Sequence, residues 1–487
     1  MSENEANQGQ NDFNRRDFIK STASLGSLML LMGGTPLYAD DATPKQAETD
    51  FSTEDQPINF AVIGCGTRGK EILQTLALLP GGTRKDGTPN PPNAPVVAIC
   101  DNYKPAIKRV KDYAPNAQVY DDYKKLLEQK DVECVVVATP SHLHRDIVIA
   151  ALQAGKHVYC EAPLATTVED ARAIAKAAKA AEKLNFQSGL QMRSDPGKKF
   201  VLDFVHTGAV GTPVMARSQW HKRESWRKAG STSERDKEVN WRLYSETSAG
   251  LAGEIGVHQY DLVTWMLGKK PLAVTGFGSI LDPKIQDSGD DRDVADTIQT
   301  IMEYPRKVNA MYDCTLANSF DGEYDMIYGT GAAILFRPES LGQNYTPAKA
   351  WLFEEVDSQV FGWEVYAAKE QFHKEVGITL SAGASHSTSG KKGIEASPYQ
   401  ESTLHYALKA FAHNSLFTAT HAKAFTDAYG ADAEGFLDEM AKPENAKGRL
   451  PAAGYREGFD ATVIAIKANE AIKKREKVML PKELFDI

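Results

Sequence analysis

The chain has 487 residues, of which 42% are hydrophobic, 65 are acidic and 56 are basic, giving a formal net charge of −9. A chain of this length can bury more than one hydrophobic core, and typical domain sizes favour two domains. The acidic balance provides no global positive field for nucleic acid or an anionic membrane, so composition excludes these classes and favours a small-molecule partner.

The N-terminus differs from the rest of the chain. Two adjacent arginines, Arg15 and Arg16, precede a short apolar stretch from Leu25 to Met32. This pattern resembles a twin-arginine signal peptide over residues 1–39, and its apolar core is too short to anchor the chain in a membrane. We therefore expect the twin-arginine export machinery to deliver the protein to the periplasm or otherwise out of the cytoplasm.

Four of the five cysteines lie in or beside predicted apolar strands: Cys65, Cys100, Cys134 and Cys160. These positions are typical of small buried hydrophobic residues and do not have metal-ligand spacing. Because the twin-arginine route carries proteins folded in a reducing cytoplasm, we expect free thiols and no metal site.

After a polar linker over residues 40–57, a buried strand over 58–63 leads through a glycine turn into a helix over 71–79. A stretch rich in Pro, Gly and Asn over 80–95 precedes a second strand, 96–100.

The alternation of strands and helices continues to about residue 184. Further strands are predicted over 118–120, 132–138 and 157–160, and helices over 122–129, 145–154 and 168–184. Apolar strands alternating with amphipathic helices predict an α/β fold whose parallel sheet is covered on both faces. We assign residues 58–184 to a Rossmann domain.

Residues 185–487 predict a second, α+β domain with a mostly antiparallel sheet. Strand-like segments run over 220–241, 273–280 and 297–304. The Ser/Gly/Thr-rich stretch 377–403 predicts a surface loop or insertion, and an amphipathic helix over 455–474 closes the fold.

A G-x-G-x-x-G motif, Gly64-Cys65-Gly66-Thr67-Arg68-Gly69, follows the first strand and opens the first helix. This is the context that a dinucleotide fingerprint requires. Gly64 suits a tight turn, Gly66 allows close approach of a pyrophosphate, and Gly69 permits close helix packing. The alternative is a purely structural glycine turn.

Asp101 ends the second strand, where an acidic residue can accept hydrogen bonds from ribose hydroxyls. Its charge would repel a 2′-phosphate, so NAD is preferred over NADP. Arg68 keeps the NADP alternative open.

Three longer motifs carry a family resemblance. They are Ala138-Thr139-Pro140-Ser141-His142-Leu143-His144, the run from Ala154 to Ala165 that contains Glu161-Ala162-Pro163, and Gly253-Glu254-Ile255-Gly256-Val257-His258-Gln259-Tyr260-Asp261. With the shorter runs 189–193 and 240–242, the chain resembles the Gfo/Idh/MocA oxidoreductases from about residue 58 to residue 267. The resemblance implies NAD binding and chemistry on a sugar or sugar derivative.

The resemblance also implies roles for individual residues. Cofactor contacts are expected beyond the three glycines and Asp101 at Thr67, Arg68, Thr139, Pro140, Ser141, His144, Glu161 and Gln191. Substrate contacts are expected at Arg193, Trp241, Arg242 and Asp261. His144 is equally compatible with a helix-start residue, and a tryptophan such as Trp241 is more often part of a core than of a sugar site.

The largest departure from the family pattern is Ala162, where the family has a catalytic lysine. Glu254 replaces the family's aspartate and His258 is retained. An acid and a histidine four residues apart on one helix would face the same side, which suits His258 as general base with Glu254 orienting it.

Three functions stay open at this point. Export favours a tightly held cofactor, because little free NAD exists outside the cytoplasm. We expect an NAD-dependent sugar oxidoreductase. The alternatives are an NAD-assisted glycosidase or epimerase without net redox, and a non-catalytic sugar-binding paralogue. A homo-oligomer, dimer or tetramer, is also expected from the resemblance.

Overall fold

The computed structural model describes residues 57–79, 94–230, 232–281, 291–338, 349–354, 378–381, 384–387, 401–430, 434–442 and 448–487. The expected signal peptide, nearly all of the linker and most of the 80–95 stretch lie outside these residues. Within them, no helix has the length and apolar character needed to cross a membrane. The described residues divide between a larger unit (within 49–196, 216–325 and 401–487) and a smaller one (within 197–215 and 326–400).

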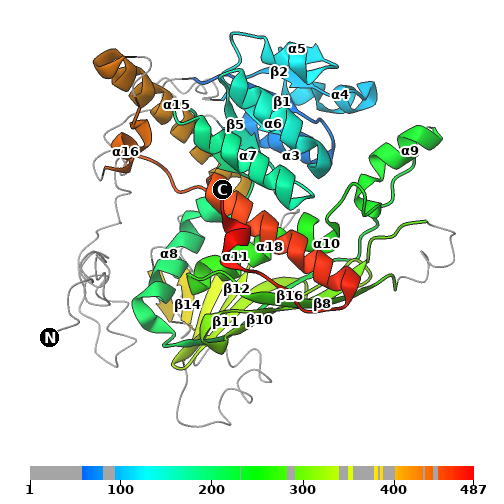
Figure 1. The fold of residues 1–487 in the computed structure, drawn as a ribbon, viewed down its shortest axis with the longest axis vertical. Coiled ribbons are helices and arrows are strands. Elements are labelled where there is room, and N and C mark those ends of the chain that lie inside the picture. Colours follow the sequence, from blue (N-terminus) through cyan, green and yellow to red (C-terminus); the bar gives the residue numbers. More distant parts are fainter. Residues whose placement is uncertain are drawn as a thin grey trace. The chain divides into compact units, whose positions relative to one another are not determined.

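The larger unit contains a six-stranded parallel sheet (Figure 1). Its strands are β1 (Phe60–Ile63), β2 (Val96–Cys100), β3 (Gln118–Tyr120), β4 (Cys134–Val137), β5 (His157–Cys160) and β6 (Phe186–Ser188). They lie in the order β3-β2-β1-β4-β5-β6 and pair in parallel, with Ile63 opposite both Cys100 and Val137. This order confirms the predicted doubly wound fold and puts the switch point between β1 and β4.

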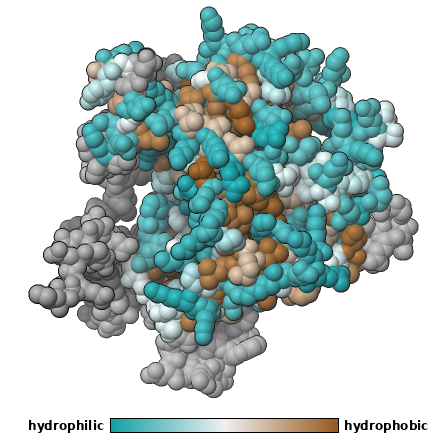
Figure 2. All heavy atoms as spheres, viewed as in Figure 1, coloured by the Kyte–Doolittle hydropathy of each residue, from teal (hydrophilic) through white to brown (hydrophobic). Residues whose placement is uncertain are grey.

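The helices of this layer follow the strands, as predicted. They are α3 (Thr67–Ala77), α4 (Lys104–Val110), α5 (Tyr123–Leu127), α6 (His144–Gln153) and α7 (Val168–Ala180). Hydrophilic side chains predominate over α4 and α5 on the face shown in Figure 2, as expected for helices with one buried stripe. The sheet itself includes β6, which lies beyond the domain limit of 184 expected from the sequence.

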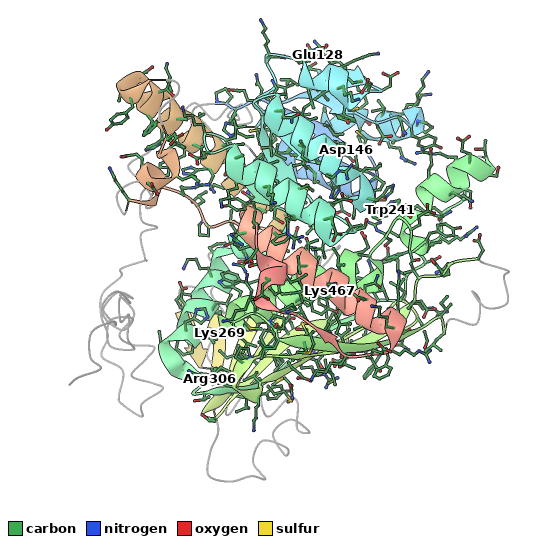
Figure 3. The ribbon with its side chains drawn as sticks, in the orientation of Figure 1. Glu128, Asp146, Trp241, Lys269, Arg306 and Lys467 are labelled. Atoms are coloured by element: carbon green, nitrogen blue, oxygen red, sulfur yellow. The ribbon has the colours of Figure 1, made fainter. Side chains whose placement is uncertain are left out.

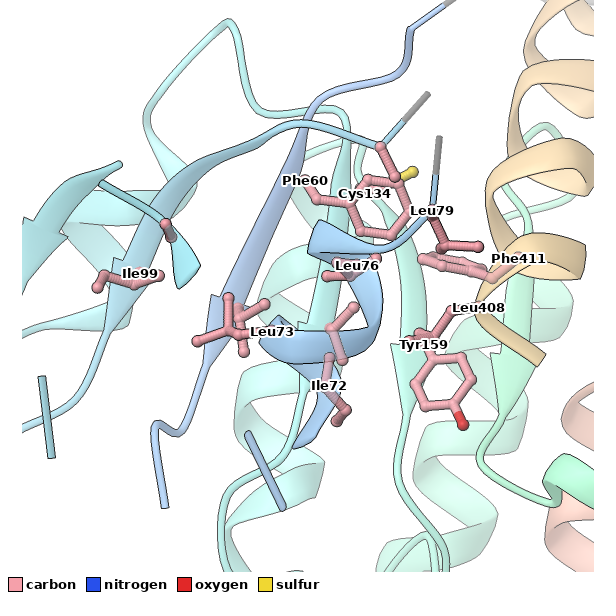
Figure 4. Close-up of a cluster of buried hydrophobic side chains, with 14 of the residues drawn as sticks. Phe60, Ile72, Leu73, Leu76, Leu79, Ile99, Cys134, Tyr159, Leu408 and Phe411 are labelled. Carbon is pink, nitrogen blue, oxygen red and sulfur yellow. The ribbon is translucent and has the colours of Figure 1, made fainter. Parts of the chain in front are cut away.

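A long helix from the C-terminal part of the chain completes the core of the parallel sheet. α15 (Thr403–Tyr429) places Leu408 and Phe411 against Phe60 and Tyr159 (Figure 4). The Phe411 ring packs edge to face on the ring of Phe60 and on the ring of Tyr159. All four side chains are fully buried. The Rossmann layer therefore depends on a helix more than 200 residues away in sequence.

A second sheet in the larger unit has the strand order β16-β8-β9-β10-β7. The strands are β7 (Pro213–His221), β8 (Ala273–Ser279), β9 (Thr297–Glu303), β10 (Asn309–Thr315) and β16 (Val478–Met479). The pairs β16–β8, β8–β9 and β9–β10 are antiparallel, which confirms the predicted sheet type.

The other α-helices among the described residues of the larger unit are α9 (Ser233–Val239), α10 (Gly250–Glu254), α11 (Gly256–Leu267), α16 (Phe436–Ala441) and α18 (Tyr455–Lys474). The predicted closing helix matches α18. It packs on β8, where a Cβ at Gly276 or Gly278 would come within 2.7 or 2.6 Å of Ile472. Glycine at these strand positions therefore lets the helix approach the sheet.

The smaller unit contains most of α8 (Pro196–Phe204) and the antiparallel pairs β12–β13, β13–β14 and β14–β15. These strands are β12 (Ala332–Arg337), β13 (Lys349–Glu354), β14 (Ile378–Ser381) and β15 (Ala384–Ser387), and β11 (Glu323–Gly329) precedes them. Of the two alternatives for 377–403, a surface loop or an insertion, the loop is wrong where β14 and β15 form a ladder. Most of the other residues of this stretch lie outside the described ones.

The prediction of strand over 220–241 is also wrong beyond His221. A loop and α9 follow, because Thr232 caps a helix by accepting a hydrogen bond from the Arg235 N–H, and the following Glu234 and Asp236 suit its first turn.

Candidate functional site

The glycine loop joins β1 to α3 at the switch point of the parallel sheet. Gly64 has a φ of +96°, and a Cβ there would lie 2.6 Å from the Ala138 carbonyl oxygen on the neighbouring strand end. A Cβ on Gly69 would lie 1.8 Å from the Gly64 oxygen. At Gly66, in contrast, no atom lies within 4 Å of an added Cβ. The loop is therefore tightly packed on its inner side and open at Gly66, as a bound pyrophosphate requires.

The Asp101 carboxylate connects the glycine loop to the end of β2. Oδ2 accepts the Cys65 N–H and Oδ1 accepts the Tyr103 N–H, both at 2.8 Å. Each carboxylate oxygen can accept a further hydrogen bond, so Asp101 can hold both loops and still receive ribose hydroxyls.

Arg68 is committed to neighbouring side chains. Its Nε lies 3.0 Å from Glu161 Oε1, one terminal nitrogen lies 2.7 Å from Gln191 Oε1, and the other lies 3.1 Å from Glu71. Burial raises the pKa of Glu161, and the charge of Arg68 offsets part of that shift. Arg68 therefore ties the first turn of α3 to β5 and to the Gln191 turn.

The loop after β4 carries one unsatisfied polar atom. Thr139 Oγ1 is buried and has no hydrogen-bond partner among the described residues. Thr139 is one of the residues that line the same cavity as the glycine loop. A buried hydroxyl without a partner calls for explanation, and a ligand in the cavity would provide one.

His144 is fully buried at the start of α6. Its Nε2 lies 2.9 Å from the Thr139 oxygen and its Nδ1 lies 3.1 Å from the Pro163 oxygen. Burial lowers the pKa of His144 to about 4, so the ring is neutral and donates to one carbonyl at a time. His144 therefore connects the loop after β4 to the loop after β5.

Glu254 and His258 do not share one helix, so that part of the sequence interpretation is wrong. Glu254 is the last residue of α10 and His258 lies in the first turn of α11. Ile255 between them has φ −122° and ψ −55°, which breaks the regular helix. Both residues nevertheless line one cavity, so the break changes how they are held and not which space they face.

The Glu254 carboxylate is held by hydroxyl groups and a guanidinium. Ser141 Oγ donates to it at 3.2 Å, Ser248 Oγ at 3.4 Å, and Arg242 Nε lies 3.6 Å away. Burial raises the pKa of Glu254, and the nearby charge of Arg242 opposes the shift. The Arg242 guanidinium lies 4.7 Å from the ring centre of Trp241, which is labelled in Figure 3.

One cavity of about 1830 Å³ contains most of the predicted site residues. From the first two loops it is lined by Gly64, Gly66, Thr67, Arg68 and Asp101. From the later Rossmann loops it is lined by Thr139, Pro140, Ser141, His144, Glu161 and Gln191. Five further residues that the sequence analysis singled out also line it: Ala162, Trp241, Arg242, Glu254 and His258. Gly69 does not line the cavity, but its lack of a side chain lets α3 pack closely against the glycine loop.

Arg193 and Asp261 do not line this cavity, and their substrate contacts stay a prediction. Arg193 Nε lies 2.8 Å from Asp261 Oδ2, and a terminal nitrogen lies 2.8 Å from Oδ1. The Asp261 side chain is only 4% exposed, and the guanidinium lies over Trp265. This buried, bidentate pair joins the turn after β6 to α11.

His142 and Lys228 are among the cavity-lining residues to which the sequence analysis gave no role. His142 places Nδ1 3.1 Å from the Thr247 oxygen and lies beside Trp241, and burial lowers its pKa. Lys228 places Nζ 3.3 Å from Thr67 Oγ1. His142 lies within the Ala138–His144 motif, which could have drawn attention to it. Lys228 belongs to a segment wrongly predicted as strand, where no motif marks it.

Comparison with known families matches two consecutive segments of the chain. Residues 58–189 match the family described as "Oxidoreductase family, NAD-binding Rossmann fold". Residues 200–335 match the "GFO/IDH/MocA C-terminal domain". The two matches together cover more than half of the chain.

Curated relatives match parts of the chain. Inositol 2-dehydrogenase of Salmonella typhimurium is 31% identical over 163 residues, which are 33% of this chain and 45% of that protein. The chain thus spans less than half the length of this relative. The 2,7-anhydro-N-acetylneuraminate hydratase of Escherichia coli is 26% identical over 279 residues, covering 57% of this chain and 67% of the relative.

Solved structures share the fold at low sequence identity. A levoglucosan dehydrogenase in complex with NADH and levoglucosan aligns with a TM-score of 0.61 and 19% identity, covering 88% of this chain and all of that one. An aldose-aldose oxidoreductase from Caulobacter crescentus aligns with a TM-score of 0.57 and 17% identity, covering 87% of this chain and all of that one.

Proposed function

Because this chain belongs to the Gfo/Idh/MocA oxidoreductase family, we propose that it is an NAD-dependent oxidoreductase of a sugar or sugar derivative that keeps its cofactor bound. The observation that carries the proposal is the shared cavity. The glycine loop, Glu254 and His258 all line this cavity, so a dinucleotide and a sugar can meet there.

The residues of the glycine-loop end fit NAD. Gly66 leaves room for a pyrophosphate, Asp101 has acceptor capacity for ribose hydroxyls, and Thr139 offers a hydroxyl without a partner. Bound NAD would supply the hydride acceptor for oxidation of a sugar carbinol. We prefer NAD to NADP because the Asp101 charge disfavours a 2′-phosphate and Arg68 is occupied by three partners.

On the substrate side, we assign the general base to His258, whose half-buried side chain faces the cavity. It would take the proton of the reacting hydroxyl. Glu254 supplies a buried carboxyl that Ser141, Ser248 and Arg242 hold in place. We propose that this fixed group sets the electrostatic environment of His258, a role that does not require the two residues to share a helix.

The retained cofactor is supported by the expected twin-arginine signal, which would export the protein already folded. A cofactor that stays bound must be restored within the site, either by reducing a second sugar or by returning the hydride to the first. The second route favours the redox-neutral alternative, a glycosidase or epimerase. The named reaction of the hydratase relative, together with Ala162, makes this alternative worth testing.

Parallel incubations of the wild type and Ala162→Lys separate these functions. The purified protein is assayed for bound NAD by mass spectrometry and then mixed with a panel of sugars and glycosides while NADH absorbance and products are followed. The proposal expects bound NAD and its reduction by at least one sugar. Product without net NADH would favour the redox-neutral route. Wild-type inactivity with gain of oxidation in Ala162→Lys would favour the non-catalytic paralogue.

A further inference from the structure

The segment between β7 and Trp241, residues 222–240, is here called the strap; the structure describes all of it except residue 231. It contains six basic and four acidic side chains in a chain whose net charge is negative. Its local charge therefore suits an anionic neighbour better than the protein surface as a whole does.

The strap is held together by its own hydrogen bonds. The buried Asn240 amide accepts the Lys228 N–H at 2.7 Å and donates to the Lys228 and Asp236 oxygens at 2.8 Å. The Asp236 carboxylate accepts the Gly230 N–H and a terminal nitrogen of Arg227, both at 3.1 Å. These bonds fix the main chain of Lys228 relative to α9.

Two side chains of the strap reach the two cofactor loops of the Rossmann layer. Lys228 Nζ lies 3.3 Å from Thr67 Oγ1, at the N-terminus of α3. The Arg235 guanidinium lies 4.1 Å from the ring centre of Tyr103, which follows the ribose-binding Asp101. The strap therefore contacts the phosphate end and the ribose end of the expected dinucleotide position, and Lys228 and Arg235 both line the cavity.

The Lys228 ammonium is poorly satisfied where it lies. Among the described residues Thr67 Oγ1 is its one hydrogen-bond acceptor, at a distance that is long for a charged donor. Burial lowers the pKa of Lys228, and the nearby cations Arg242 and Arg109 lower it further. The N-terminus of α3 adds a partial positive charge beside the Lys228 ammonium, so an anion at this position would be stabilised by both.

We propose that the strap closes the dinucleotide cleft, with Lys228 binding the cofactor pyrophosphate above Gly66 and Arg235 on Tyr103 fastening the ribose end. This inference rests on the proposed NAD dependence and adds the device that retains the cofactor. Lys228 acts on binding and not on the chemical step, and the strap must open before the dinucleotide can leave.

The test compares Lys228→Met with Lys222→Met. Lys222 lies on the same strap but pairs with Glu224 and does not line the cavity, so it is a matched charge-removal control. Each protein is stripped of nucleotide, checked by thermal unfolding, and titrated calorimetrically with NAD, ADP-ribose and adenosine. NAD dissociation is followed by rapid mixing with competing ADP-ribose.

Loss of a charged hydrogen bond should weaken NAD and ADP-ribose binding to Lys228→Met about 10- to 100-fold, with most of the change in the dissociation rate. Adenosine, which has no phosphate, should bind both variants like wild type. Arg235→Ala should speed dissociation of NAD without removing the phosphate contact. Because a buried lysine can also affect folding, the adenosine titration shows that the variant's site is intact.

Two results overturn the inference in different ways. If wild type binds NAD tightly and Lys228→Met binds and releases it equally well, the strap does not hold the cofactor and the proposed function stands. If wild type binds neither NAD nor ADP-ribose, the strap and the NAD-dependent function fail together.

Discussion

The two ends of the cavity depend on different features of the chain. At the glycine-loop end the decisive features are side-chain atoms that the glycines lack: a Cβ at Gly64 or Gly69 would collide, and one at Gly66 would enter open space. At the Glu254 end the walls are ionisable side chains held by hydroxyls and a guanidinium. Substitutions that add atoms should therefore have the larger effect at the glycine-loop end. Substitutions that remove a charge or a titrating proton should have the larger effect at the Glu254 end.

The largest expected effect is at the ionisable end. His258→Ala should lower the rate of the chemical step by about 10²–10⁴-fold, because it removes the proposed general base. NAD binding should be unchanged, since the glycine loop is untouched. Single-turnover rates and NAD titration of the same variant measure the two quantities. A variant that retained wild-type turnover would exclude His258 as the base.

A buried ion pair outside the cavity sharpens the comparison. Asp261→Asn leaves Arg193 buried without its charged partner and should lower the free energy of unfolding by about 3–5 kcal/mol. The KM for sugar should not change in the folded protein, because neither residue lines the cavity. Urea unfolding and steady-state kinetics test this. A large rise in KM with normal stability would support the substrate role predicted from sequence.

At the glycine-loop end, Gly66→Val should weaken NAD binding by at least about 100-fold, because the branched side chain fills the space meant for the pyrophosphate. Its φ of −68° suits any residue, so the unfolding midpoint of the NAD-free variant should match wild type. Gly69→Ala is the contrasting control and should destabilise the fold itself, because its Cβ meets main chain at 1.8 Å. Tight NAD binding by Gly66→Val would contradict the assignment.

The smallest effect concerns the pH dependence of stability. Burial raises the pKa of Glu254 above its ordinary value of 4.5, so the folded protein holds that proton more tightly than the unfolded chain. Wild-type stability should therefore fall relative to Glu254→Gln as pH rises from 4.5 through the raised value, and the difference should level off above it. Denaturant unfolding of both proteins across that range gives the result, and a pH-independent difference would argue against an ionising buried Glu254.

The sequence predicted the Rossmann layer closely because its signals are local. Each strand is a short apolar run, the glycine spacing lies in one loop, and α18 has a clear apolar stripe that matches the predicted limits. Long-range packing left no such signal. Nothing in the sequence around Phe411 indicates that α15 completes the core of the parallel sheet.

The site was predicted where motifs mark it and missed where side chains meet across the chain. Spacing alone suggested that Glu254 and His258 share a helix, but the break at Ile255 is a backbone conformation that residue type does not encode. The mutual pairing of Arg193 with Asp261 and the approach of Lys228 to Thr67 join residues 68 and 161 positions apart. Only the folded chain shows whether such charges face a ligand or each other.

The most direct test of NAD-dependent sugar chemistry follows the transferred hydrogen. A sugar that reacts in the panel is prepared with deuterium on its ring carbons, mixed with the NAD-loaded protein for one turnover, and the nucleotide is analysed by mass spectrometry. We predict one deuterium on the nucleotide in wild type, transiently if the reaction is redox-neutral, and none in His258→Ala. Product formed by wild type with no label reaching the nucleotide at any time would contradict the central claim.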